Sequence, residues 1–332
     1  MEFGIFAPTF AGGDADVRIL NRPFYKAIDW PSERNAILEA ERLGFDSYWV
    51  CDHLSVGEGG SIFENWTTVT SYLNITRRIR VGPMMLCNSF RYPSIVARMA
   101  ATLDIISGGR LELGIGAGWF RLECEEYGIT FPDAKTRVEA LREGITIIRK
   151  LWQEKRVTFE GKYYRVKDAT CYPRPIQEPY PPIVIGGGTK PMIRLAAELG
   201  DAYNWFFSPQ DFREKLRILE QFCSEAGRNY KEIKKYWLGH VLIFKDGKRV
   251  ENMFKSWYEM VKSAKTRYDP WVRDSSYEDF KKNVIVGTPE DCIERVRQYQ
   301  DIGVDCVICN FVDHPSLEGL RLFANEVMPH FK

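Results

Sequence analysis

The chain has 332 residues, of which 45% are hydrophobic and 27% charged, and its 46 basic and 45 acidic side chains leave a formal net charge of +1. This is the composition of a globular protein with a large apolar core. The charge is balanced and has no blocks of one sign, so nothing in the sequence suggests binding to nucleic acid or to a membrane surface, and we expect neither as a partner.

The segment Met1–Pro8 has the character of a buried strand rather than of a secretory leader. The longest nearly apolar stretch, Tyr236–Phe244, is shorter than the roughly 20 residues that span a bilayer. The eight cysteines are spread over a long chain, unlike those of a small disulfide scaffold. Cys306 and Cys309 share one apolar run and would face opposite sides of a strand. We therefore expect a cytoplasmic protein with free, packed cysteines.

Short apolar runs alternate with longer segments of helical periodicity along the whole chain. The predicted strands are Phe3–Ala7, Ser47–Cys51, Ile79–Leu86, Leu111–Ile115, Ile183–Ile185, Ala202–Phe206, Trp237–Phe244 and Cys306–Asn310. The predicted helices include Glu33–Leu43, Ser94–Ile106, Lys135–Trp152, Met192–Leu199, Phe212–Ala226 and Pro289–Gln300.

Apolar strands that alternate with helices indicate a parallel sheet covered on both faces. About eight such units favour a (β/α)8 TIM barrel in a single domain, residues 1–332, over an open doubly wound sheet, which stays the alternative. Three long segments are predicted insertions, at Phe10–Pro31, Lys155–Pro181 and Arg249–Asn283. Within the second, Val157–Val166 is expected to form a hairpin that turns at Gly161.

Active sites of such barrels lie where the strands end and the next loops begin. His53 follows the second predicted strand and is the best candidate for proton transfer, because imidazole titrates near neutral pH. The neighbouring Asp52 could bind a cofactor, orient His53 or cap a turn. Cys87 and Asn88 follow the third strand. Trp119, after the fourth strand, and Trp205, within the sixth, are candidate ligand contacts.

Two glycine runs also lie at strand ends. Gly114–Gly118 lacks the spacing of a dinucleotide fingerprint and indicates either a planar ligand close to the backbone or a tight turn. The run Gly186, Gly187, Gly188 and Thr189 precedes a helix, where bare amides could bind phosphate, or it could be a plain turn. No histidine or cysteine group has metal-ligand spacing, so no metal is expected.

Several longer motifs resemble the bacterial luciferase-like superfamily. They are Ala40–His53, Arg80–Gly82, Phe90–Pro93, Leu103–Trp119, Phe159–Tyr164, Pro173–Pro175, Gly200–Asp201, Val286–Glu290 and Phe323–Pro329. The resemblance covers nearly the whole chain and implies that superfamily's TIM barrel. Its Gly-Ala-Gly-Trp and Phe-Arg-Tyr-Pro motifs are most similar to the branch that uses the deazaflavin coenzyme F420.

The resemblance also implies roles for individual residues. His53 would exchange a proton during hydride transfer, and Asp52 would contact the cofactor. A non-prolyl cis peptide would join Met84 to Met85 behind the flavin ring, and Gly187 and Gly188 would bind phosphate. Family members are commonly homodimers, so a homodimer is expected.

Some positions depart from the family's patterns. Ala117 replaces the arginine that grips the phosphate of FMN in the luciferases. The sugar-phosphate dehydrogenases have a tryptophan at the position of Gly57, a glutamate at that of Trp119 and a lysine in the region of Phe207–Pro209. Because this chain has none of the three, the comparison with that group argues against glucose 6-phosphate as substrate. The favoured function is an F420-dependent oxidoreductase acting on a small organic substrate; the alternatives are an FMN-dependent monooxygenase and a barrel that only stores cofactor.

Overall fold

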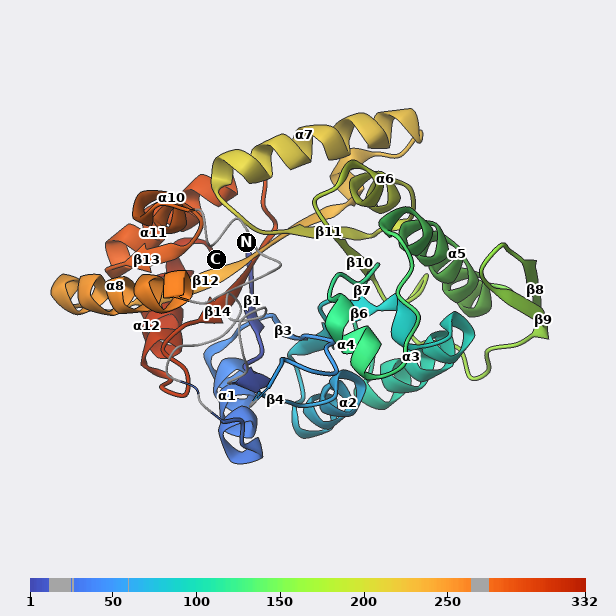
Figure 1. The fold of residues 1–332 in the computed structure, drawn as a ribbon, viewed down its shortest axis with the longest axis horizontal. Helices are drawn as coiled ribbons and strands as arrows, with labels where there is room; N and C mark the ends of the chain where they lie inside the picture. Colours follow the sequence, from blue (N-terminus) through green and yellow to red (C-terminus); the bar gives the residue numbers. More distant parts are fainter. Residues whose placement is uncertain (12–24, 26, 59, 264–274) are drawn as a thin grey trace.

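The barrel strands lie in one parallel sheet. A computed structural model describes residues 1–11, 25, 27–58, 60–263 and 275–332. The strands are β1 (Glu2–Phe6), β3 (Ser47–Val50), β5 (Arg80–Pro83), β6 (Leu86–Cys87), β7 (Leu113–Gly116), β10 (Ile183–Gly186), β11 (Ala202–Trp205), β12 (Lys234–Ile243) and β14 (Cys306–Phe311). Their order, β5-β3-β1-β14-β12-β11-β10-β7-β6, is that of a nearly closed barrel (Figure 1).

The third barrel strand is divided into β5 and β6, and the two halves pair with different neighbours. β5 pairs with β3 on one side, whereas β6 pairs with β7 on the other, and a single bridge from Val81 to Leu111 also joins the two sides. Counting the halves as one strand gives the eight strands of a (β/α)8 barrel. The predicted TIM barrel is therefore confirmed, with the predicted strand Ile79–Leu86 corrected to two short ones.

Helices cover the outside of the barrel (Figure 1). They are α1 (Trp30–Leu43), α2 (Asn65–Ile75), α3 (Pro93–Ser107), α5 (Ala134–Gln153), α6 (Lys190–Leu199), α7 (Pro209–Glu225), α8 (Gly247–Ser263), α10 (Tyr277–Lys282), α11 (Pro289–Asp301) and α12 (Glu318–Glu326). The short helix α4 (Arg121–Glu126) lies in the connection between β7 and α5. Local signals set several ends: Asp29 caps α1 and left-handed Gly44 stops it, while Thr288 and Asp291 form a capping box on α11.

The predicted insertions contain more regular structure than expected. Residues 249–283 hold most of α8 and all of α10, whose apolar faces pack with β12 in a separate cluster around Phe254 and Trp257. The expected hairpin is present as β8 (Val157–Glu160) and β9 (Arg165–Ala169), so its second strand runs past the predicted end. The segment Phe10–Pro31 lies partly outside the described residues; its described part includes β2 (Phe10–Ala11), which pairs with β4 (Ser61–Ile62).

Two apolar cores are separated by the strand pleat. Alternate residues such as Phe6, Trp49 and Tyr236 fill the barrel interior, and their neighbours pack outward against the helices. Cys306 lies in the inner core and Cys309 in the outer one, which confirms that they pack on opposite faces.

The third and fourth barrel strands approach so closely that only glycine fits between them. A Cβ added to Gly82 would lie 2.1 Å from the carbonyl oxygen of Glu112, and one added to Gly114 would lie 2.1 Å from that of Pro83. Glycine at these positions lets the barrel close at the divided strand.

The two ends of the chain meet beside the amino-terminal end of β1. The ammonium group of Met1 donates to the carbonyl oxygen of Phe331 at 3.0 Å, and β1 pairs with β14, the last barrel strand. Figure 1 shows the N and C marks close together. Among the described helices, none has the length and apolar character needed to cross a membrane.

Candidate functional site

His53 lies just beyond β3, at the carboxyl end of the barrel, and is held by a buried glutamate. Its Nδ1 lies 2.9 Å from Glu123 Oε1, and the backbone N–H of Leu54 donates to Glu123 Oε2 at 2.7 Å. The His53 side chain is 10% exposed and that of Glu123 is 3% exposed. Since a carboxylate only accepts hydrogen bonds, the ring hydrogen belongs on Nδ1, which leaves Nε2 as the acceptor nitrogen.

Two aromatic rings from the loop after β7 enclose the His53 ring. Trp119 and Phe120 meet it edge to face, with ring centroids 5.6 and 6.1 Å away. Phe120 is buried, but Trp119 is 47% exposed and presents a broad apolar surface at the barrel mouth. Trp119 therefore lies where a ligand beside His53 would contact it.

Asp52 is a buried structural link rather than an open carboxylate. It accepts two hydrogen bonds from the guanidinium of Arg91, at 2.8 and 3.1 Å, and one from the backbone N–H of Cys87 at 2.8 Å. Burial raises the pKa of Asp52, and the charge of Arg91 opposes that shift. Arg91 also pairs with Glu64, which caps α2. Asp52 thus fixes the end of β3 to the start of the loop after β6.

The peptide bond between Met84 and Met85 is cis, which confirms the expectation from the family resemblance. Met84 is buried in the inner core, and the Met85 side chain fills space that three glycines on neighbouring strands leave open. A Cβ at Gly114, Gly116 or Gly186 would contact Met85 at 3.1, 3.2 or 2.9 Å. The two methionines therefore form an apolar floor beneath the glycine-lined mouth.

Cys87 and Asn88 lie at the same rim, and their side chains are already engaged. The Cys87 sulfur would meet a Cβ at Gly118 at 2.7 Å. Burial, followed by the charge of Asp52, raises the pKa of the Cys87 thiol far above its usual value, so it is no thiolate nucleophile. The Asn88 amide donates to the hydroxyl of Tyr164 in the β8–β9 loop, at 2.9 Å.

The second glycine loop joins β10 to α6. Gly187 has φ 138°, and the N-cap Thr189 makes no side-chain hydrogen bond to the first turn of α6. The backbone N–H groups in the first turn of this ten-residue helix therefore have no capping side chain and are available to an anion, whereas the N–H of Gly187 donates to the carbonyl oxygen of Asn204 at 3.4 Å. The Trp205 ring lies against this loop, because a Cβ at Gly188 would be 2.1 Å from it.

The predicted site residues therefore lie along one rim of the barrel, from β3 through β6, β7 and β10 to β11. Sequence reasoning missed Glu123 as the partner of His53 and Arg91 as the partner of Asp52. Arg91 lies within the motif Phe90–Pro93. No local pattern marks Glu123, because its contact with His53 joins residues 70 apart in the sequence. Among the described residues, no cluster of three or more histidine, cysteine, aspartate or glutamate side chains could hold a metal ion.

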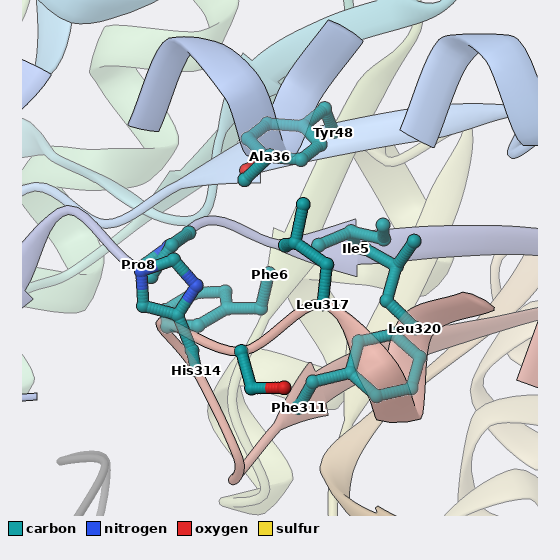
Figure 2. Close-up of a pocket in the computed structure, with 10 residues that line it drawn as sticks. Ile5, Phe6, Pro8, Ala36, Tyr48, Phe311, His314, Leu317 and Leu320 are labelled. Carbon is teal, nitrogen blue, oxygen red and sulfur yellow. The ribbon is translucent and has the colours of Figure 1, made fainter. Parts of the chain in front are cut away.

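A separate small cavity lies between the barrel wall and helices α1 and α12. It is lined by Ala36, Tyr48 and His314, among others, and its volume of about 10 Å³ suits one water molecule (Figure 2). It is too small for a substrate. His314 is buried there, and its ring meets that of Tyr25 edge to face at 4.5 Å.

Comparison with known proteins gives a consistent result. The family model described as luciferase-like monooxygenase matches residues 1–306. An F420-dependent glucose-6-phosphate dehydrogenase of Microbacterium testaceum is 31% identical over 327 residues, which cover 93% of this chain and 96% of that protein. A second protein of that name, from Intrasporangium calvum, is 29% identical and covers 88% of this chain and 92% of its own length.

A solved F420-dependent secondary alcohol dehydrogenase, in complex with an F420–acetone adduct, superposes with a TM-score of 0.81. It is 23% identical and covers 100% of this chain and 99% of its own, so this likeness shows the fold. Together with the barrel and the cis peptide described above, the match over residues 1–306 shows that the chain belongs to the luciferase-like monooxygenase family of enzymes.

Proposed function

We propose that this enzyme is an oxidoreductase that transfers a hydride between coenzyme F420 and a small organic substrate. The observation that carries the proposal is His53 at the barrel mouth, with Nδ1 bonded to Glu123 and Nε2 without a hydrogen-bond partner among the described residues. F420 dependence in the names of the two dehydrogenase relatives supports the choice of cofactor.

The site has the features that a flat, anionic deazaflavin requires. The glycines at 116, 118 and 186–188 make room for the side chains of Met85, Cys87, Met192 and Trp205, and Met84 and Met85 offer an apolar floor for a ring system. The uncapped first turn of α6 offers amides to a phosphate. Bound F420 would supply the hydride chemistry, and the protein would supply position and shielding.

Within this proposal, His53 handles the proton that accompanies the hydride. In the direction of alcohol oxidation, Nε2 accepts the hydroxyl proton of the substrate; in the direction of carbonyl reduction, the imidazolium returns it. A positioned acid or base of this kind contributes roughly 10²–10⁴-fold in rate. Trp119 and Phe120 pack against the His53 ring and limit the access of water to it.

The substrate is proposed to be a neutral alcohol, aldehyde or enone. Glucose 6-phosphate must be tested first because it appears in the names of the relatives, although Trp119 places an indole beside His53 where a glutamate stands in the sugar-phosphate dehydrogenases. Trp119 is the most exposed aromatic ring that contacts His53, and it favours apolar over phosphorylated substrates.

The test begins with equilibrium binding of oxidised F420 and of FMN to the purified protein, followed by the fluorescence of each. Micromolar or tighter binding of F420, F420-dependent turnover, and loss of that turnover in His53→Asn are expected. His330→Asn, at an exposed histidine, is the matched control and should keep full activity. Binding of FMN alone with oxygen-dependent turnover would overturn the proposal in favour of a monooxygenase, and binding without any turnover would favour cofactor storage.

We further propose that the partner of this chain is a second copy, bound through α2 and α3. Helix α2 has no charged residue in its 11 positions, whereas the 20 residues of α5 include seven, from Lys135 to Lys150. On α3, Ile95 and Ile106 are 55% and 59% exposed, and they lie on one face because eleven residues are three turns of helix.

Three hydroxyl groups of this face are satisfied within their own helices, and the exposed Arg98, between Ile95 and Thr102, donates to the carbonyl oxygen of Tyr172. The hydroxyls of Thr70 and Ser71 donate to carbonyl oxygens of α2, and that of Thr102 donates to Arg98 of the same helix. Burying the exposed isoleucines and these already bonded hydroxyls against a partner therefore costs little hydration free energy. A twofold axis would bring the same apolar face of each copy together.

The mass of the protein in solution tests this proposal. We expect a dimer by light scattering, and Ile106→Glu should shift it to a monomer, while Arg213→Glu on exposed α7 should not. A wild-type monomer at micromolar concentration, or a dimer unaffected by Ile106→Glu together with Ile95→Glu, would overturn it.

A further inference from the structure

We propose that Glu123 is a positioning residue that fixes which nitrogen of His53 carries the hydrogen, and so makes Nε2 competent to accept a proton. This inference rests on the proposed function for its catalytic consequence, but the hydrogen position itself can be tested on the protein without cofactor or substrate.

Both oxygens of the Glu123 carboxylate are committed to the same short segment of chain. Oε1 accepts a hydrogen bond from His53 Nδ1 at 2.9 Å, and Oε2 accepts one from the backbone N–H of Leu54 at 2.7 Å. One rigid carboxylate thereby holds the ring and the peptide next to it. A second conformation of the ring would break one of these bonds and leave a buried polar group unpaired, which costs about 1–3 kcal/mol.

The position of Glu123 on its helix is unusual for a glutamate. Helix α4 turns Glu123 and Cys124 inward, where they are 3% and 1% exposed, whereas Glu125 and Glu126 face solvent. A buried carboxylate is retained only where partners satisfy it. Those partners are His53 and Leu54, so the helix buries this charge specifically against the His53 segment.

The carboxylate also balances the charge that proton transfer creates. When Nε2 accepts a proton from the substrate's hydroxyl, the ring becomes a cation, and the anionic Oε1 lies 2.9 Å from its other nitrogen. The pair is enclosed by Trp119 and Phe120, where such an interaction is screened less than in water. Glu123 therefore favours the proton-holding state without touching substrate.

Glu123→Gln tests this directly because it changes the donor pattern at nearly constant shape. If the new carboxamide keeps its oxygen on the Leu54 N–H, its NH2 group faces Nδ1, which must then accept, and the hydrogen moves to Nε2. The other orientation would set the NH2 group against the Leu54 N–H. Loss of the correct histidine tautomer in a Ser-His-Asp triad costs about 10⁴-fold in rate.

The decisive measurement is the 15N spectrum of histidine-labelled protein without cofactor. The chain has only four histidines, so His53→Asn identifies the signal. We expect hydrogen on Nδ1 in the wild type and in Glu126→Gln, the matched control from the same helix, and hydrogen on Nε2 in Glu123→Gln. If Glu123→Gln fails to fold, Glu123→Asp replaces it, and its shorter carboxylate should leave a mixture of both tautomers.

Kinetics provide the second readout. Glu123→Gln should lower kcat by about 10²–10⁴-fold with little change in KM, which marks a loss confined to the transition state. A wild-type tautomer in Glu123→Gln, or an unchanged kcat, would overturn the inference. If the wild type shows no F420-dependent turnover, the proposed function fails, and the spectrum still decides whether Glu123 sets the tautomer.

Discussion

Replacing Gly188 by alanine is expected to displace the Trp205 ring and to destabilise the protein. The new Cβ would lie 2.1 Å from the indole, and contacts below 3.0 Å are not tolerated, so the ring must retreat by about 0.9 Å. It cannot retreat freely, because the indole is also stacked on Phe206 with ring centroids 4.2 Å apart. Overpacking of this kind costs about 1–3 kcal/mol.

The assay is thermal unfolding of four variants. Gly188→Ala should lower Tm by about 1–4 °C, whereas Gly247→Ala is the matched control, because the only contact that its Cβ would make among the described residues is at 4.0 Å. Trp205→Leu and the double variant complete a cycle. Removing the ring should make Gly188→Ala tolerable, so the two changes should be non-additive by at least about 1 kcal/mol.

Additive effects in that cycle would refute the reasoning, since they would mean that the ring is not what forbids a side chain at position 188. A Gly188→Ala protein as stable as Gly247→Ala would refute it as well. Binding of F420 by the double variant would then show whether the loop needs the indole itself or only its own backbone conformation.

Three further predictions concern stability. Asp313→Asn should change how stability depends on pH: burial raises the pKa of Asp313 to about 6, so the wild type should lose up to about 3 kcal/mol of stability as the pH rises from 4 to 6, because this carboxyl ionises in the unfolded chain while the buried one stays protonated. Denaturant unfolding should show no such extra loss in Asp313→Asn, and parallel pH curves for the two proteins would contradict this. Arg91→Leu should cost about 3–5 kcal/mol by leaving Asp52 buried without its cation, whereas Arg194→Leu, from an exposed pair, should cost at most about 1 kcal/mol; equal losses would contradict it. Gly114→Ala should prevent accumulation of folded protein, because its Cβ would lie 2.1 Å from a backbone oxygen that cannot rotate away; a soluble protein with wild-type circular dichroism would contradict it.

The alternation of strands and helices in the sequence was enough to predict most of the fold, because apolar runs such as Ile183–Ile185 and Cys306–Asn310 are typical of strands in a parallel sheet that is covered on both faces. Helix α2 was missed because Thr67, Thr68, Thr70 and Ser71 have weak intrinsic helix propensity. In the structure, several of their hydroxyls bond back to carbonyls one turn earlier. Tertiary packing, not local preference, makes this segment a helix.

At the site, strand ends were enough to find His53 and Asp52, since a barrel places every strand end on one rim. Their partners could not be found in that way. Glu123 is on a six-residue helix whose inward face depends on how the loop after β7 folds. The hydrogen bond from the Asn88 amide to Tyr164 could not be found either, because it joins residues 76 apart in the sequence.

The bond between Met1 and Phe331 has a practical consequence. Both chain ends lie beside the amino-terminal end of β1, at the pole of the barrel opposite the strand ends that carry His53. A tag or surface linker attached at either end would therefore orient the enzyme with its mouth towards solution. A short peptide could also join the two ends, which would allow new termini to be opened in an exposed loop elsewhere on the molecule.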